Sequence, residues 1–347
     1  MPDLAYPPKP RPGDRVAILS PSAGLPGLFP MPFELGLRRL RTDFGLIPVE
    51  YPTTRVMGSA PAARAADIHA AFADPGITAV IASIGGDDEI RVLRHLDADL
   101  LRANPKPFFG YSDNTCLLAY LWQLGVVSFH GGSVMVQFGR PGAMHPDTEA
   151  SLRAALLRPG EYQLTPPAAY SDVERDWADP ATFESEPRLE PAGEWQWHNA
   201  GRVVEGASWG GNIEVLSWLL MAGAAVPSAA DCRGGVLFLE TSEELPAATE
   251  VHRILRALGE RGLLREFPAV LFGRPKAWSL DHRTTAEEKA AYVRDQHEAV
   301  LRALGEYAPD AMVVLDVDFG HTDPQLVIPY GGRIRVDGVA RRITVRY

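Results

Sequence analysis

Three polar residues that could act together in acyl transfer stand at the predicted carboxyl ends of strands: Ser112, Glu240 and His321. A neutral serine is a poor nucleophile, so it needs a histidine that takes its proton and a carboxylate that orients the histidine. The chain order Ser, Glu, His permits this chemistry, although unrelated folds use several orders. The set predicts a serine hydrolase in which the fold brings three distant segments together.

The stretch around Ser112 predicts a short strand, a tight turn with the serine at its apex, and a helix that ends at Gly125. A hydroxyl in that place projects toward the free N–H groups of a helix N-terminus, which favour a developing negative charge. Gly110 matches the first half of the G-x-S-x-G nucleophile elbow, but Asn114 stands where the second glycine would be. A second interpretation stays open, in which the serine and Asp113 only cap the helix.

Two glycines follow the preceding predicted strand, residues 77–84, in the sequence Gly85-Gly86-Asp87-Asp88. Glycines at the carboxyl end of a parallel strand allow a backbone N–H to approach a ligand, and ligands of open α/β sheets bind at that edge. If this strand neighbours residues 107–109, the N–H groups of Gly86 and Asp113 could form an oxyanion hole. The alternative is a simple strand-to-helix turn.

Other polar residues near strand ends have structural explanations. His130 could be a base, but a histidine at a strand end is more often a satisfied structural group. Glu243 and Glu244 are interpreted as acids that cap the next helix, predicted over 247–261. Capping does not explain Glu240, which precedes the cap in an apolar strand.

Competing chemistries lack their motifs. The chain has no H-E-x-x-H, no clustered cysteines and no Walker loop, and Gly85-Gly86-Asp87-Asp88 is not a G-x-G-x-x-G fingerprint. We therefore expect neither a metal nor a dinucleotide cofactor. Only Cys116 and Cys232 are present, both in apolar surroundings, which predicts a reducing compartment and no disulfides.

Composition narrows the class of protein and its partners. Hydrophobic content of 46% and charged content of 22% are typical of a soluble globular protein, and the net charge of -10 argues against nucleic acid as a partner. The longest apolar run, Val215 to Val226, is about half the length of a membrane span. Residues 1–12 show no signal-peptide pattern. We expect a cytoplasmic protein with a small-molecule substrate and no membrane partner.

Strands and helices alternate along the first part of the chain, which predicts an α/β fold with a parallel sheet covered on both faces. A length of 347 residues favours two domains. We expect a nucleophile domain at 1–160, a proline-rich connection and substrate loop at 161–206, and a domain at 207–347 that carries the glutamate and histidine. In the last of these, Gly210-Gly211-Asn212 is predicted to be a glycine turn that leads into an apolar helix.

Five short blocks, in this order across nearly the whole chain, resemble the serine peptidases that include the LD-carboxypeptidases of cell-wall recycling and the microcin C self-immunity proteins. They are Ser83-Ile84-Gly85-Gly86-Asp87-Asp88, Gly110-Tyr111-Ser112-Asp113, Gly210-Gly211-Asn212, Phe238-Leu239-Glu240 and Asp318-Phe319-Gly320-His321-Thr322. The resemblance implies a Rossmann-like or flavodoxin-like N-terminal domain and a C-terminal α/β domain of the swivelling type, with the site in the cleft between them. It also implies a metal-free acyl-enzyme mechanism, commonly in a homodimer.

The resemblance assigns roles to individual residues. It implies Ser112 as the nucleophile, His321 as the general base, Glu240 as its orienting partner, and the N–H groups of Gly86 and Asp113 as the oxyanion hole. For substrate contacts it suggests Trp177, whose ring would stack on adenine, together with Asn212 and Lys276. A tryptophan in such a loop can equally cap its own small cluster, and a strand-end lysine is more often a surface group.

Two branches of this family compete. The Gly-Gly-Asp-Asp block, the chain length and the tryptophan-bearing segment before Gly210 look more like the microcin C immunity branch, whose members hydrolyse aminoacyl-nucleotide amides. The murein carboxypeptidases instead remove a terminal D-residue. Outside the family, a non-catalytic two-lobed binding protein and a general α/β-hydrolase esterase remain alternatives; the complete Ser, Glu, His set argues against the first, and Asn114 against the second.

Overall fold

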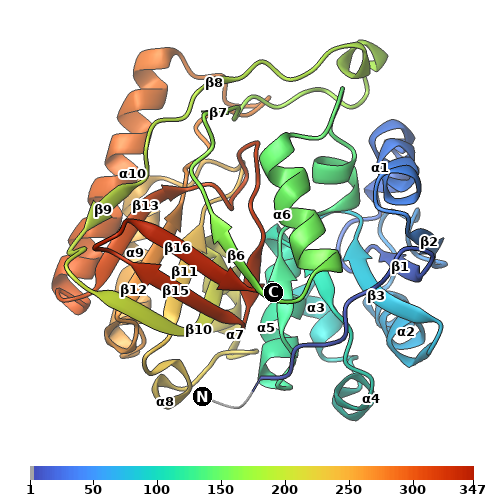
Figure 1. Cartoon of the computed structure of the whole chain (residues 1–347), viewed down its shortest axis with the longest axis horizontal. Helices are drawn as coiled ribbons and strands as arrows, with labels where there is room; N and C mark the ends of the chain where they lie inside the picture. The colour runs from blue at the N-terminus through green and yellow to red at the C-terminus, as the bar shows by residue number, and fades with distance from the viewer. Residues whose placement is uncertain (1–3) are drawn as a thin grey trace.

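The computed structural model describes residues 4–347 and contains two mixed α/β units that share a buried junction (Figure 1). The first unit is built on a six-stranded sheet in the order β14-β5-β4-β3-β1-β2. Its strands are β1 (Arg15–Leu19), β2 (Ile47–Glu50), β3 (Ile77–Ala82), β4 (Phe108–Gly110), β5 (Ser128–His130) and β14 (Ile328–Tyr330). The strands β1 to β5 pair in parallel, and β14 is antiparallel to β5.

The helices of this unit follow the strands in alternation. They are α1 (Pro30–Thr42), α2 (Pro61–Ala73), α3 (Ile90–Leu93), α4 (Ala98–Ala103), α5 (Thr115–Gln123) and α6 (Pro146–Leu157), with the short helices η1 (Leu25–Gly27), η2 (Ser112–Asn114) and η3 (Val134–Phe138). Parallel strands need crossover connections, and these helices cover the sheet, so β3 is an almost wholly buried apolar run. The alternation of strands and helices predicted from the sequence is confirmed.

The second unit is built on an eight-stranded sheet in the order β6-β16-β15-β10-β11-β12-β13-β9. Its four central strands, β10 to β13, are parallel, and antiparallel strands flank them on both sides. The strands are β6 (Glu161–Leu164), β9 (Gln196–His198), β10 (Val203–Asn212), β11 (Val236–Glu240), β12 (Ala269–Gly273), β13 (Met312–Val317), β15 (Arg333–Asp337) and β16 (Arg342–Arg346).

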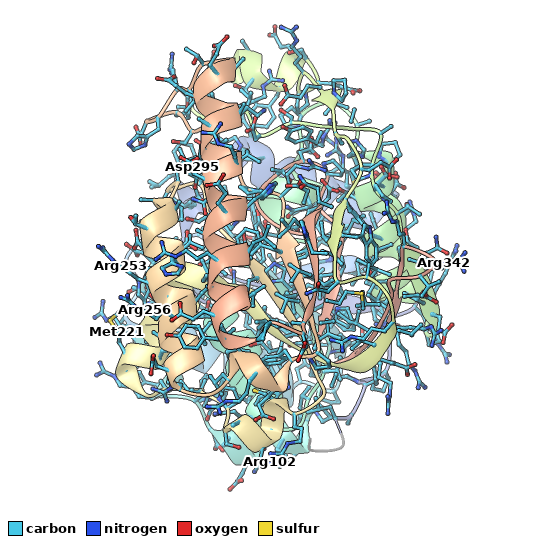
Figure 2. The ribbon with its side chains drawn as sticks, turned by 90° about the vertical axis from the view of Figure 1, so that its left-hand side faces the viewer. Arg102, Met221, Arg253, Arg256, Asp295 and Arg342 are labelled. Atoms are coloured by element: carbon cyan, nitrogen blue, oxygen red, sulfur yellow. The ribbon has the colours of Figure 1, made fainter. Side chains whose placement is uncertain are left out.

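Four helices complete the second unit: α7 (Ile213–Ala222), α8 (Ala229–Cys232), α9 (Ala248–Glu260) and α10 (Ala286–Tyr307), together with η5 (Leu264–Glu266). Figure 2 shows α9 and α10 side by side, with Arg253 and Arg256 of α9 and Asp295 of α10 on the outer surface. The buried stripe of α9, which includes Val251, Leu255 and Leu258, faces inward as the 3.6-residue period requires. None of the helices among residues 4–347 is both long enough and apolar enough to cross a bilayer.

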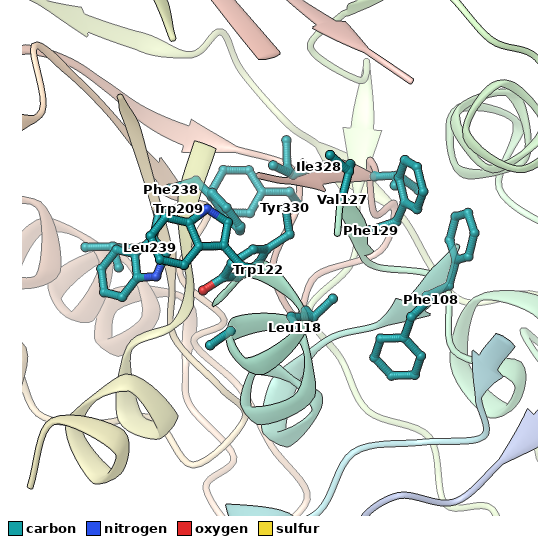
Figure 3. Close-up of a cluster of buried hydrophobic side chains, with 14 of the residues drawn as sticks. Phe108, Leu118, Trp122, Val127, Phe129, Trp209, Phe238, Leu239, Ile328 and Tyr330 are labelled. Carbon is teal, nitrogen blue, oxygen red and sulfur yellow. The ribbon is translucent and has the colours of Figure 1, made fainter. Parts of the chain in front are cut away.

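Segments far apart in the sequence join the two units. The C-terminal part of the chain returns through β14 into the first sheet, and Ala5 of the N-terminal arm pairs with Val126. Figure 3 shows the buried cluster at this junction, where Tyr330 of β14 and Trp122 of α5 lie among large side chains of both sheets. The hydrophobic core is therefore continuous across the two units.

The segment from 161 to 206 carries little regular structure besides β6 and β9. It contains the two-residue strands β7 (Ala169–Tyr170) and β8 (Glu190–Pro191) and the short helix η4 (Pro180–Glu184). β6 and β9 occupy the two edges of the eight-stranded sheet. The loop between β7 and β8 extends at the top of Figure 1.

The predicted glycine turn at Gly210-Gly211-Asn212 is wrong, because β10 continues through all three residues and pairs with β11. The glycines serve close packing instead. A Cβ on Gly210 would lie 1.7 Å from the carbonyl oxygen of Phe238, and one on Gly211 would lie 2.7 Å from a methyl carbon of Thr115 on α5. The strand can therefore approach both β11 and the first unit only without side chains there.

Candidate active site

Ser112 occupies a strained turn between β4 and α5. Its φ is 60°, in the left-handed region that a residue with a Cβ adopts at a cost. Gly85 makes room for this turn, since a Cβ there would lie 2.9 Å from Cβ of Ser112. Asn114 fixes the turn by donating from Nδ2 to the carbonyl oxygens of Ile84 and Tyr111, each at 3.0 Å. The residue that departs from the nucleophile elbow thus ties the ends of β3 and β4 together.

The Asp113 carboxylate connects the loops that surround this turn. Its Oδ2 accepts a hydrogen bond from the Ser22 hydroxyl at 2.5 Å and another from the Glu89 N–H at 2.8 Å. Within residues 4–347, neither the Gly86 N–H nor the Asp113 N–H donates to a protein acceptor. Both donors therefore remain available to an oxygen atom of a ligand.

A substitution at Gly86 tests this loop. Its φ is +156°, and a Cβ would lie 2.1 Å from Oγ of Ser22, so Gly86→Ala should push Ser22 away from Asp113. We expect a rate loss of about 10²-fold, as for loss of one oxyanion donor, and a stability loss of about 1–3 kcal/mol. The measurements are hydrolysis rate and chemical denaturation.

Gly58→Ala is the matched control for the Gly86 variant. Gly58 also has a positive φ, +71°, but a Cβ added there would have no atom within 4 Å. It should lose some stability through backbone strain and keep its rate. Equal rates for the two variants would contradict a role for the Gly86 loop in turnover.

Glu240 and His321 lie in direct contact in the second unit. Glu240 ends β11 and is fully buried, and its Oε2 accepts a hydrogen bond from Nδ1 of His321 at 2.6 Å. Gly273 and Gly320 leave room for this carboxylate, since Cβ atoms there would lie 2.8 and 3.1 Å from Cβ of Glu240. The pair keeps a proton on Nδ1 of the imidazole, with Nε2 facing the other way.

The other ring nitrogen of His321 meets a second carboxylate. Nε2 lies 3.2 Å from Oε2 of Glu243, whose side chain is 49% exposed. The interpretation of Glu243 as a helix-capping acid is wrong, because α9 begins after Ala247 and receives no side-chain cap. Although burial disfavours the imidazolium, Glu240 and Glu243 together raise the pKa of His321 to about 9.

The nucleophile turn and the histidine lie at one place in the molecule. The ring of Tyr111, the residue before Ser112, is 4.9 Å from the ring of His321, centroid to centroid. Among the described residues, no hydrogen bond joins the Ser112 hydroxyl to His321, whose Nε2 faces Glu243 instead. A proton transfer from the serine requires that Nε2 become free.

Two buried residues support the loop that carries His321. His130 donates from Nε2 to the carbonyl oxygen of Phe319 at 3.2 Å, and burial lowers the pKa of His130 to about 4. Gln325 donates to the Gly320 carbonyl and accepts from the Gly132 N–H, so it bridges the loop to the first unit. The structural interpretation of His130 therefore fits the structure better than a role as base.

The three residues predicted to contact substrate lie in different settings. Asn212 is 1% exposed and caps α7 by accepting from the Val215 N–H at 3.0 Å. Lys276, just after β12, is buried and lies 3.4 Å from Glu174, and its charge acts on His321. Trp177 packs edge-on against Phe29, with centroids 6.0 Å apart. Of these, Lys276 has the clearest electrostatic link to the histidine.

Sequence reasoning missed Gln325, the contact of Glu243 and the buried acid Glu89. Glu89 is 0% exposed, and its carboxyl oxygens have no hydrogen-bond partner within residues 4–347. Burial and the neighbouring Asp113 carboxylate raise the pKa of Glu89 well above its ordinary value. In the sequence it resembles any acid at the start of a helix, so no local signal distinguishes it.

A serine in a strained turn at the carboxyl edge of one parallel sheet, beside a histidine–glutamate pair from a second sheet, defines a serine peptidase-like hydrolase. Comparison with known proteins gives the family. The family model described as the LD-carboxypeptidase N-terminal domain matches residues 16–131, and the one described as the LD-carboxypeptidase C-terminal domain matches residues 205–336. The chain therefore belongs to the LD-carboxypeptidase family, Peptidase_S66.

Relatives in this family carry two kinds of name. The chain is 28% identical to the microcin C7 self-immunity protein MccF of Escherichia coli, over 81% of this chain and 77% of that protein. It is 28% identical to a "probable murein peptide carboxypeptidase" of Bacillus subtilis (strain 168), over 78% and 72%. Both branches considered from the sequence are thus among its relatives.

Solved structures match the whole chain. An MccF-like protein from Streptococcus pneumoniae in complex with AMP has a TM-score of 0.84 and 25% identity, over 96% of this chain and 99% of that one. MccF in complex with aspartyl sulfamoyl adenosine has a TM-score of 0.82 and 24% identity, over 99% and 98%. The expected two-domain α/β architecture and the resemblance to the MccF-like branch are confirmed.

Proposed function

We propose that the chain hydrolyses the acyl bond between an aminoacyl or peptidyl group and a nucleotide, through an acyl-enzyme on Ser112. The hydrogen bond of 2.6 Å between His321 and the buried Glu240, beside the Ser112 turn, carries the proposal. In this mechanism the Ser112 hydroxyl attacks the carbonyl carbon and Nε2 of His321 takes its proton. Glu240 orients the imidazole and stabilises the imidazolium.

The oxyanion of the tetrahedral intermediate would accept hydrogen bonds from the N–H groups of Gly86 and Asp113. Their lack of protein acceptors supports this role. His321 then returns its proton to the leaving nitrogen, the amide bond breaks, and water attacks the acyl-serine with His321 again as base. No metal or cofactor is required in this sequence of steps.

The nucleotide part of the proposal draws on ligands of related structures. MccF has been solved with aspartyl sulfamoyl adenosine and with glutamyl sulfamoyl guanosine, and an MccF-like protein with AMP. We extend this class of ligand to the present chain, with Trp177 as the ring that would stack on the base after it leaves Phe29. Asn212 and Lys276 would contact the polar parts of the substrate.

A second candidate is removal of a terminal D-amino acid from a murein tetrapeptide. It is favoured by the family model itself and by the Bacillus subtilis relative. The same serine, histidine and glutamate would act, because both reactions transfer an acyl group from nitrogen to the serine and then to water. A binding protein without turnover is the remaining alternative.

A product assay with the purified protein distinguishes these functions. Aspartyl sulfamoyl adenosine and a murein tetrapeptide ending in D-alanine are offered side by side, and released amino acids are quantified. We expect free aspartate from the nucleotide analogue. Release of D-alanine alone would establish the second candidate, and binding of the analogue without turnover of either compound would contradict both enzyme assignments.

A further inference from the structure

The contact between Glu243 and His321 lies where the serine must come during catalysis. His321 uses Nδ1 for Glu240, so only Nε2 can take the proton of Ser112. In this structure Nε2 faces Oε2 of Glu243 at 3.2 Å. The resting enzyme therefore pairs its base with a carboxylate in place of the nucleophile.

The charges around His321 stabilise this resting pair. The ionisable side chains that face or influence the imidazole come from several elements: Glu240 at the end of β11, Glu243 after it, Lys276 after β12, His130 of β5 and Tyr111 before η2. His130 is neutral, since burial lowers its pKa, and Tyr111 is neutral because burial raises its pKa. Glu240 and Glu243 raise the pKa of His321 by more than Lys276 and burial lower it, so His321 is protonated at neutral pH.

The Glu243 side chain is free to leave this pair. Its half-exposed carboxylate has His321 as its sole ion-pair partner within the described part of the chain. The preceding residue is fixed, because Ser242 donates from both its N–H and its hydroxyl to the buried Glu214. Because the backbone before Glu243 is held and its side chain has this one ion pair, the Glu243 carboxylate can rotate away from His321 without moving β11.

An aminoacyl substrate brings a cation to the same place. Its α-ammonium group is attached to the carbon next to the scissile carbonyl carbon, so it arrives beside the Ser112 hydroxyl and Nε2 of His321. We propose that Glu243 binds the α-ammonium group of an aminoacyl substrate and thereby leaves Nε2 of His321 to Ser112. The inference rests on the proposed function and adds to it a residue that selects free aminoacyl groups over N-acylated ones.

The exchange balances in charge and protons. Before binding, Glu243 pairs with the imidazolium; afterwards it pairs with the ammonium, and His321 gives its extra proton to solvent. Once the Glu243 charge has moved away, one of the two carboxylates that favour the imidazolium is gone. Binding of the correct substrate thus produces the neutral base that the reaction needs, whereas an N-acylated substrate has no cation to draw Glu243 away.

The test compares Glu243→Gln with the wild-type enzyme on two substrates, aspartyl sulfamoyl adenosine and its N-acetyl derivative. Wild type should prefer the free amine by about fivefold in kcat/KM, the upper end of the range for one partly exposed ion pair. Glu243→Gln should lose that preference to within about twofold. With the N-acetyl substrate, the rise of kcat/KM with pH should move to lower pH, because the variant lacks a charge that raises the pKa of His321.

Glu244→Gln is the matched control, since it removes the same charge from the neighbouring exposed position and should keep both the preference and the pH profile. An unchanged preference in Glu243→Gln would overturn the inference, as would loss of turnover of both substrates in a variant whose thermal unfolding is normal. If Glu243→Gln does not fold, Glu243→Ser provides the same comparison. The proposed function fails separately, if wild type releases neither aspartate from the first substrate nor N-acetylaspartate from the second.

Discussion

Replacing Ser112 with alanine should lower the rate of hydrolysis by about three to six orders of magnitude, the range found when a nucleophilic serine is removed from a preorganised site. The residual rate would come from the oxyanion donors and from substrate positioning. Folding should be almost unaffected, because the hydroxyl makes no hydrogen bond among the described residues and alanine is strained to a similar degree at a φ of 60°. We expect the unfolding midpoint to change by no more than about 2 °C.

Rate and affinity are measured separately for this variant. Single-turnover hydrolysis reports the chemical step, and calorimetric titration with the same substrate should show affinity close to that of wild type. Ser217→Ala is the control, since that hydroxyl bonds the Glu214 carbonyl on the half-buried side of α7 and should leave the rate intact. A Ser112→Ala enzyme with wild-type turnover would show that another group forms the acyl-enzyme.

Local patterns in the sequence were sufficient for the parallel core of the first unit. The run Ile77–Ala82 is apolar on both faces, as a central parallel strand must be, and glycines or small polar residues follow where the chain turns. The same logic placed Ser112, Glu240 and His321 at strand ends. Glu240 and His321 meet because the carboxyl ends of the parallel strands β11 and β13 lie on one edge of the second sheet, whereas Ser112 comes from the first sheet.

Pairings between distant segments could not be predicted in this way. β14 joins the first sheet and β6 joins the second, although each lies far in sequence from its partner strand. Strand choice at a sheet edge depends on side-chain packing across the whole fold, which no local window contains. Gln325 illustrates the consequence for the site. It lies just before β14, so it reaches Gly132 of the first unit only because β14 joins the first sheet.

The error at Glu243 has a different cause. An acid a few residues before a helix satisfies the rule for capping, and the rule is correct on average. Here a tertiary contact overrides it, because His321, in the loop after β13, pairs with Glu243, and α9 receives no side-chain cap. Glu240 was distinguished from its neighbours by its place in a buried strand, which is information that the sequence does contain.

The effect of Glu240→Gln follows from its position on Nδ1 of His321. The amide keeps the shape of the buried carboxylate but not its charge, so the imidazolium that forms during proton transfer loses its counter-ion. We expect a rate loss of about 10²- to 10⁴-fold, as when the carboxylate of a serine-protease triad is replaced by an amide. The measurement is kcat/KM at several pH values, with Glu244→Gln as the control.

The same substitution changes how stability depends on pH, and the sign can be worked out. His321 has a pKa of about 9 in the folded wild type, above its unfolded value, so its contribution to the free energy of unfolding is present at low pH and disappears as pH rises through about 9. Without the Glu240 charge, burial lowers that pKa, and chemical denaturation should show a weaker loss of stability over this range. If Glu240→Gln instead kept both the rate and the pH dependence of wild type, Glu243 would be the next carboxylate to consider. Glu243, however, contacts Nε2 of His321, which is the nitrogen that must receive the proton of Ser112. It could therefore not orient His321 toward Ser112 without first leaving that nitrogen.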